Sequence, residues 1–133
     1  MDIEAFLACD AATDQLGKLN VLGSFDAFVV PRLPHIHPQF SVALRVRFRR
    51  SEAGDHPFRF NLINEDGKPV IKPLDGNLSI RIRPDDEFGV VNIVFNLRDT
   101  RFDSYGRYSL DLIVDGSPRG SLPLWVRPAP ASA

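Results

Sequence analysis

An alternation of arginine with apolar residues is the pattern in this chain that points most directly to chemistry. It fills the second half of segment 40–49 and recurs in segments 58–62 and 77–83. Successive side chains of an extended strand point to opposite faces. The arginines are therefore expected to share one outer face if 40–49 pairs with 58–62 as a hairpin and 77–83 lies in the same sheet. That predicted face consists of Arg45, Arg47, Arg49, Arg59, Arg81 and Arg83.

A face lined with guanidinium groups binds carboxylates or phosphates through paired, charge-assisted hydrogen bonds. An acidic protein is the ligand that the sequence favours. A nucleic acid is disfavoured because no exposed aromatic side chains interleave with the arginines, and single strands are held largely by stacking. A solvated face that protects the sheet from edge pairing, neutralised by acids such as Glu52, Asp85 and Asp86, explains the same pattern without any ligand.

A pair of histidines suggests a second kind of site. In Pro34-His-Ile-His-Pro38 an extended backbone points His35 and His37 to the same side, a spacing that suits two imidazole ligands on one metal ion. Two ligands alone hold a metal weakly, and the sequence does not bring His56 or a carboxylate to them. Imidazoles that support a proline-rigid loop are the simpler interpretation, so no metal or other cofactor is predicted.

No residue pattern in the chain indicates catalysis. Ser24, Ser79 and Ser109 lack the context of a nucleophile elbow, and neither phosphate-binding nor dinucleotide-binding glycine motifs occur. Cys9 stands in an apolar run with no adjacent base to lower the pKa of its thiol. The sequence therefore predicts a protein that is not an enzyme.

Length and composition are those of one globular domain. The 133 residues suffice to bury a core without disulfides, and the hydrophobic fraction of 44% and charged fraction of 25% are ordinary. A net charge of −1 supplies no global attraction to nucleic acids or membranes. A single cysteine, an acidic start at Met1–Phe6 and the lack of a long apolar segment predict a cytoplasmic protein without a membrane span.

Turn residues divide the chain into short alternating segments, which predicts an all-β fold. Asp-Gly pairs at 66–67, 75–76 and 115–116 accommodate the positive φ angles of hairpin turns. We expect a single antiparallel β-sandwich of about seven to nine strands over residues 1–127. Residues 128–133, which are only Pro, Ala and Ser, are expected to be a disordered tail.

Glycine and proline mark expected interruptions of the strands. Leu22-Gly23-Ser24 is expected to hold a bulge or a switch between sheets. Pro31 and Pro73 are expected to end edge strands, which a partner extends in β-augmentation. Trp125 is expected either to close one end of the core or to lie half-exposed at an interface.

The segment Asp103-Ser-Tyr-Gly-Arg-Tyr108 resembles the tyrosine-corner strand of immunoglobulin-like domains, in which a tyrosine hydroxyl bonds to nearby backbone. The resemblance implies that Tyr108 takes that part and that the sandwich has immunoglobulin-like topology. Leu110 stands where antibody domains carry cysteine, and segment 40–49 lacks a core tryptophan. The expected domain is therefore free of disulfides.

Over residues 8–127 the chain is also similar to a small uncharacterised bacterial β-sandwich family, a domain of unknown function. Segments 12–26, 37–38, 44–48 and 64–68 carry this resemblance. It implies a compact β-sandwich and no particular chemistry.

Together these observations predict a non-enzymatic protein-interaction module or small structural subunit. Its contact surfaces are expected to be the arginine face and a free sheet edge, and homodimerisation through a face or an edge stays open. One alternative is a metal- or small-ligand-binding sandwich built on His35 and His37. The other is an anion- or nucleic-acid-binding protein that uses the arginine face.

Overall fold

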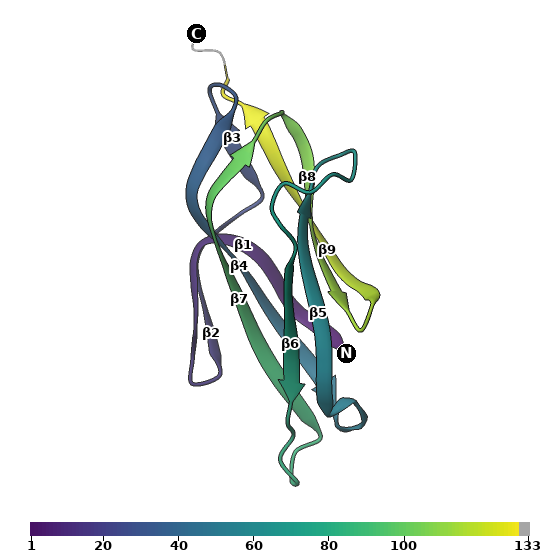
Figure 1. Ribbon diagram of the computed structural model, residues 1–133. Coiled ribbons are helices and arrows are strands. Elements are labelled where there is room, and N and C mark those ends of the chain that lie inside the picture. The colour runs from purple at the N-terminus through teal and green to yellow at the C-terminus, as the bar shows by residue number, and fades with distance from the viewer. Residues whose placement is uncertain (131–133) are drawn as a thin grey trace.

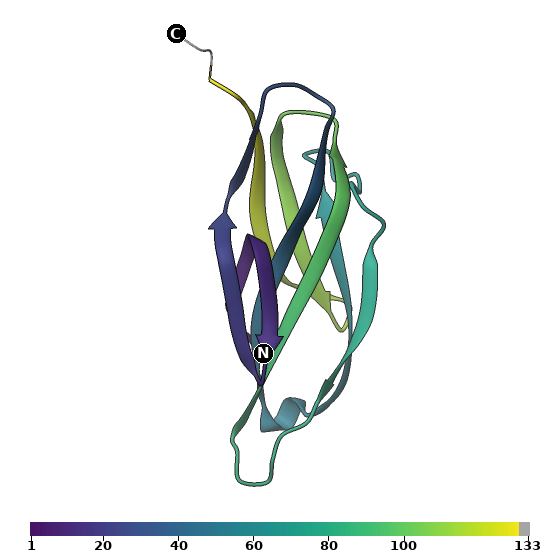
Figure 2. The ribbon, with the colours of Figure 1, turned by 90° about the vertical axis from the view of Figure 1, so that its left-hand side faces the viewer.

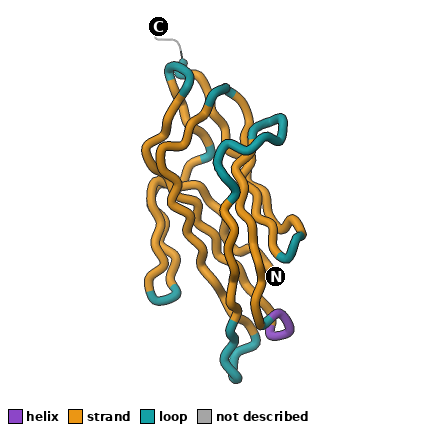
Figure 3. Tube along the Cα trace, in the orientation of Figure 1, coloured by secondary structure: helices purple, strands orange, loops and turns teal. Residues whose placement is uncertain are grey.

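The computed structural model describes residues 1–130, which form nine strands and one short 3₁₀ helix (Figure 1). In chain order these elements are β1 (Asp2–Gln15), β2 (Lys18–Phe25), β3 (Ala27–Val30), β4 (His35–Arg49), η1 (Arg50–Glu52), β5 (Gly54–Ile63), β6 (Leu74–Ile80), β7 (Phe88–Phe102), β8 (Gly106–Val114) and β9 (Ser117–Pro128). Most connections are tight turns, and the two longer ones join β5 to β6 (64–73) and β6 to β7 (81–87) (Figure 3). The predicted all-β class is confirmed, and no helix within residues 1–130 is long and apolar enough to span a membrane.

The strands form two sheets. Sheet A has the order β2-β1-β4-β7 and is antiparallel throughout, and sheet B has the order β3-β9-β8-β5-β6. Sheet B is mixed because β3 runs parallel to β9, with Ala27 opposite Trp125. The prediction of a purely antiparallel sandwich is wrong at this pair. Since β3 joins β9 from a distant part of the chain, no hairpin turn fixes its direction.

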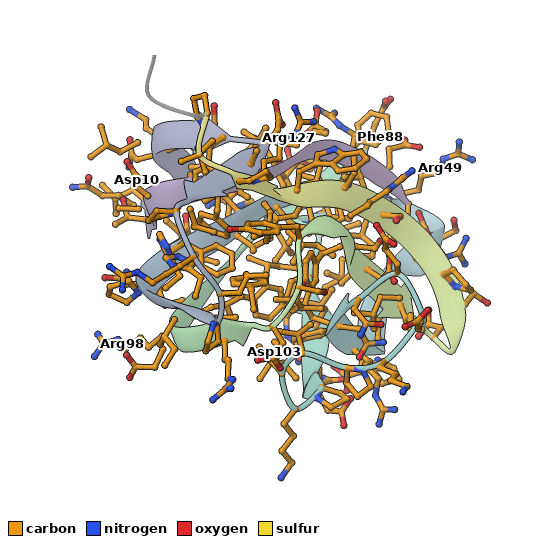
Figure 4. The ribbon with its side chains drawn as sticks, turned by 90° about the horizontal axis from the view of Figure 1, so that it is seen from above. Asp10, Arg49, Phe88, Arg98, Asp103 and Arg127 are labelled. Carbon is orange, nitrogen blue, oxygen red and sulfur yellow. The ribbon has the colours of Figure 1, made fainter. Side chains whose placement is uncertain are left out.

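The core between the sheets follows from the two-residue period of the strands. On β4, Val42, Leu44, Val46 and Phe48 are fully buried, as the alternation predicted. Leu110, on β8, is equally buried in sheet B. Figure 4 shows carbon-rich side chains filling the interior and the labelled charged residues at the periphery.

The hairpin of β1 and β2 folds over the outer face of sheet A (Figure 2). Cys9 is the last residue of β1 to pair with β4, and beyond it β1 pairs only with β2. The hairpin tip returns to the sheet, where Arg45 Nη1 and Asn92 Nδ2 donate hydrogen bonds of 3.2 and 3.1 Å to the Gly17 carbonyl. Ala43, which belongs to the same outer row of β4 as the arginines, is fully buried on this side.

The chain changes sheets at Asp26, after the position that the sequence indicated. Leu22-Gly23-Ser24 stays within β2, whose pairing with β1 runs on to Phe25 opposite Ala8. Gly23 has a φ of 66° and lies under the Asp10 carboxylate, which occupies the space that a Cβ would need. The glycine therefore serves a close side-chain approach and not a bulge.

The three Asp-Gly pairs have different roles. Asp115-Gly116 closes the β8–β9 hairpin with φ angles of 53° and 76°, as predicted. Asp66-Gly67 turns within the β5–β6 connection, where the Gly67 N–H donates to the Asn64 carbonyl at 3.0 Å. Asp75-Gly76 is not a turn: both residues lie in β6, and Gly76 pairs with Phe58 of β5. A Cβ on Gly76 would overlap the Phe58 ring, so this glycine makes room for an aromatic side chain.

The carboxyl-terminal segment is more ordered than its composition suggested. Pro128 is the last residue of β9 and lies opposite Val30 of β3, and the Ala129 N–H donates to the Val30 carbonyl at 3.1 Å. Proline is compatible with this position because β8 pairs with β9 only as far as Val126, so residue 128 has no ladder hydrogen bond to donate on that side. Strand β9 thus runs one residue past the expected end of the sandwich at residue 127, and residues 131–133 of the expected tail lie outside the described part of the chain.

We predict that Gly76→Ala destabilises the fold, because the added methyl overlaps the Phe58 ring, which packs 5.8 Å from the Phe95 ring between centroids. Overpacking of this kind costs about 1–3 kcal/mol, and denaturant titration measures it. The cost should shrink in a Phe58→Leu background, and Asn77→Ala on the exposed side should change little. An equal cost in both backgrounds would show that Gly76 is not there for the ring.

Candidate interaction surface

The structure separates the predicted arginine face into three groups. Strands β4 and β5 follow each other in the chain but lie in different sheets, so the expected hairpin between 40–49 and 58–62 is wrong. Helix η1 carries the chain across, and Glu52 at its end accepts hydrogen bonds from the Arg49 N–H at 3.0 Å and the Met1 ammonium at 2.8 Å. A short polar loop serves a crossing between sheets as well as a hairpin, and the strand pattern alone does not distinguish the two.

Three of the predicted arginines remain together. Arg45, Arg47 and Arg49 project from the outer face of β4, and we call them the arginine strip. Arg45 and Arg47 share one carboxylate, that of Glu4 on β1, at 3.3 and 2.9 Å. Within residues 1–130, Arg49 makes no ion pair. The strip therefore keeps a guanidinium group that forms no ion pair with a described carboxylate.

The other three predicted arginines lie elsewhere. Arg59 projects from the outer face of sheet B and pairs with Asp75 of β6 at 2.7 Å. This hydrogen bond raises the pKa of Arg59 and lowers the pKa of Asp75, and both side chains stay in solvent. Arg81 and Arg83 are exposed in the connection between β6 and β7. The six arginines thus do not form one face.

An exposed apolar edge borders the arginine strip. Within residues 1–130, strand β7 pairs only with β4, and its register places Phe88 opposite Arg49 and Val90 opposite Arg47. Phe88 is 43% exposed and lies with its ring centroid 5.1 Å from the Arg47 guanidinium. Figure 4 shows Arg49 and Phe88 on the same side of the molecule. The sequence did not indicate Phe88, because its place beside the strip depends on the pairing register.

The two candidate metal ligands lie together at the start of β4. His35 Nε2 and His37 Nδ1 share a hydrogen bond of 3.1 Å, so each imidazole spends one nitrogen on the other. They line a hollow of about 290 Å³ with Asp10 and Phe28. His56 lies away from them, against the Asp115 carboxylate at 2.7 Å. No group of three or more His, Cys, Asp or Glu side chains placed to hold a metal occurs in residues 1–130.

Burial sets the protonation of His37. It lowers the pKa of His37 below its ordinary value, and neighbouring His35 acts in the same direction, while Asp10 and the Gln39 backbone oppose them. The His37 ring packs against Phe28 with centroids 4.2 Å apart. Asp10 lies on β1 and His37 on β4. The sequence did not indicate that they are close, because their proximity depends on the pairing of these two strands in sheet A.

Trp125 lies half-buried on the outer face of sheet B. Its ring centroid is 5.1 Å from the Arg127 guanidinium and 6.0 Å from that of Arg107. Beside it is a hollow of about 460 Å³ whose rim includes Glu65, and Glu65 Oε1 accepts the Arg107 N–H at 2.7 Å. The ring is partly buried and is not part of the core cluster, and an interface at this place stays a prediction. The guanidinium groups of Arg107 and Arg127 flank the Trp125 ring.

Comparisons with known proteins give a family and a distant likeness. A family of unknown function, DUF6941, matches residues 4–127. No curated protein matches the chain. Among solved structures, a Pseudomonas fluorescens alkylpurine DNA glycosylase, AlkC, bound to DNA containing an abasic site analog, is similar over 94% of this chain and 30% of that chain, with 9% identity and a TM-score of 0.46. A likeness at this level carries no inference about function.

We predict that acid destabilises the fold through His37. A histidine whose pKa is lowered on folding binds fewer protons in the folded state than in the unfolded state. Its contribution to the free energy of unfolding is therefore complete above about pH 6.5, and it is lost as the pH falls towards the pKa of the folded state. Denaturant titrations above and below about pH 6.5 should show a smaller loss on acidification for His37→Gln than for the wild type.

His56 supplies the matched control for this experiment. The Glu52 carbonyl and the Asp115 carboxylate raise the pKa of His56, so its stabilising contribution is complete below its unfolded pKa and is lost as the pH rises through the folded value. His56→Gln should therefore increase the loss of stability on acidification. Identical pH profiles for wild type and His37→Gln would refute the role assigned to His37.

Proposed function

We propose that this chain, which belongs to the family of unknown function DUF6941, is a non-enzymatic protein-interaction module whose partner presents acidic side chains. The observation that carries the proposal is the arginine strip, Arg45, Arg47 and Arg49, side by side on β4 and bordered by exposed Phe88. Guanidinium and aromatic groups are the side chains most enriched among the residues that dominate binding energy at protein interfaces.

The geometry of the strip suits carboxylates. Glu4 already bridges Arg45 and Arg47, which demonstrates that a carboxylate fits between neighbouring guanidinium groups on this face. Arg49 has no such partner among the described residues. An acidic side chain from a partner is expected to bind Arg49 through paired hydrogen bonds while its apolar neighbours cover Phe88.

The burial of the single thiol supports the non-enzymatic part of the proposal. Cys9 is fully buried, and burial, followed by the nearby Asp10 charge, raises the pKa of its thiol. A buried thiol of this kind is a poor nucleophile. A cytoplasmic location is part of the same proposal, since the lone cysteine does not form an internal disulfide.

We also propose that the topology is a variant of the immunoglobulin-like sandwich. In that fold, strands B and E share one sheet and strands C, F and G share the other. Here β4 and β7 are neighbours in sheet A, as B and E would be, and β5, β8 and β9 are neighbours in sheet B, as C, F and G would be. A hydrogen bond of 2.7 Å from the Tyr108 hydroxyl to the Ser104 carbonyl supports the assignment of β8 to strand F. The parallel β3 and the folded-over β1–β2 hairpin are departures from it.

Charge reversal on the strip tests the proposed function. Arg47→Glu combined with Arg49→Glu should abolish capture of an acidic protein from native cytosol, because two attractive charges become repulsive. Arg59→Glu is the control: it reverses one arginine charge on the other sheet and should leave capture intact. Thermal unfolding of both variants should stay close to that of the wild type.

The same experiment separates the alternatives. Capture that survives the double substitution, or that Arg59→Glu removes equally, would exclude the strip as the binding surface. A nuclease-sensitive eluate whose retention falls steeply with salt would instead support nucleic-acid binding by the same arginines, since phosphate contacts release counterions.

A further inference from the structure

One long sheet edge is left open in the described structure. Strand β7 has 15 residues and pairs only with β4, and residues 88–97 carry no charged side chain. Natural proteins protect such edges with short strands, charges or proline, because open backbone groups recruit another strand. The two edge strands of sheet B are shorter: β3 has four residues and is followed by Pro31, and β6 has seven residues and is preceded by Pro73. β7 lacks these protections over most of its length.

Two features limit the part of β7 that is free to pair with another strand. Near its start, Gly89 lies against the Ile82 side chain and the Arg81 carbonyl, so the preceding connection covers the strand there. Near its end, Asp99 has a φ of 50°, which interrupts the regular strand conformation. The edge available to another strand is therefore residues 90–98, Val-Val-Asn-Ile-Val-Phe-Asn-Leu-Arg.

The order of apolar and amide residues over 91–97 is the same in both directions. With Val94 as centre, Ile93 mirrors Phe95, Asn92 mirrors Asn96, and Val91 mirrors Leu97. Two-fold symmetric antiparallel strands place each residue opposite its mirror position. Such pairing would match apolar side chains with apolar ones and amides with amides, and would set no like charges directly opposite each other.

The two faces of the strand match as well. The inner row, Ile93 and Leu97, is buried, and Val91 and Phe95 pack partly against the core. Mirror positions about residue 94 have the same parity, so inner residues would meet inner residues of the second copy and outer residues would meet outer ones. Partly exposed Val91 and Phe95 would gain further burial.

We propose that a second copy of this chain pairs antiparallel with β7 about a two-fold axis at Val94, which joins two A sheets into one sheet of eight strands, four from each copy. The axis is perpendicular to the sheet, so both arginine strips lie on the same face of the dimer. The inference stands on the β7 edge and does not rest on the binding of an acidic partner.

The tip of the β1–β2 hairpin supplies an independent observation on the same side. Leu16 is 96% exposed and has a φ of 53°, a conformation that turn tips normally give to Gly, Asn or Asp. The next residue, Gly17, is hydrogen-bonded to Asn92 of β7. An apolar side chain held at this place is explained by contact with the second copy.

Charge placed on the axis tests the pairing. Sedimentation equilibrium should show a dimer for the wild type and at least about a tenfold weaker dimer for Val94→Lys and for Val94→Glu alone, since each brings two like charges together. An equimolar mixture of the two variants should dimerise again, which misfolded chains cannot do. Leu22→Lys, on the edge strand β2, is the control and should leave the dimer unchanged.

The register is tested by cross-linking. Val94→Cys should form a disulfide between copies under mild oxidation, whereas Val90→Cys should not, because its mirror position is Arg98. The native Cys9 is fully buried and does not compete. A monomeric wild type, a dimer unaffected by Val94→Lys, a mixture that stays monomeric, or cross-linking at Val90→Cys alone would each overturn the proposal.

Discussion

The inner row of β4 packs against sheet B, and this contact fixes the orientation of the whole strand. Val42, Leu44, Val46 and Phe48 are fully buried between the sheets. Because the side chains of a strand alternate, their burial forces the other row to the outer face of sheet A. A shift of one residue would bury the guanidinium groups and expose the core. The arginine strip is therefore held in place by the hydrophobic packing on the opposite face.

The β1–β2 hairpin then decides which part of that outer face stays open. Ser41 and Ala43 are buried on it, whereas the strip beyond them is accessible. Arg45 contributes to both regions, since it donates to the Gly17 carbonyl of the hairpin tip and also reaches Glu4. The open region combines cationic side chains, an aromatic ring and a free strand edge, which is the composition expected of a protein contact surface.

Local periodicity was enough to predict the all-β class, the buried row of β4 and the turn at Asp115-Gly116. It was not enough for contacts that join distant segments. The placement of Arg59 failed because a short polar connection does not reveal whether the chain forms a hairpin or crosses to the other sheet. Gly76 looked like a turn residue because the ring of Phe58 that occupies its space belongs to another strand.

In the candidate site, too, the sequence indicated what lies on one strand and missed what depends on strand pairing. The sequence indicated Arg45, Arg47 and Arg49 as a group, since one strand carries all three. Phe88 escaped notice because only the β4–β7 register brings it to Arg49. The near-symmetry around Val94 is visible in the sequence, but its meaning depends on β7 being an edge, which is a property of the sheet order.

Amide hydrogen exchange along β7, followed at low and high protein concentration, tests most directly whether this side of sheet A is a contact surface. Strand pairing protects the amides that point away from β4, whereas an open edge leaves them to solvent. If two copies pair through β7, alternate amides between Val90 and Arg98 become protected as the concentration rises, while those of β3 do not change. Exchange along β7 that is fast and independent of concentration would contradict it.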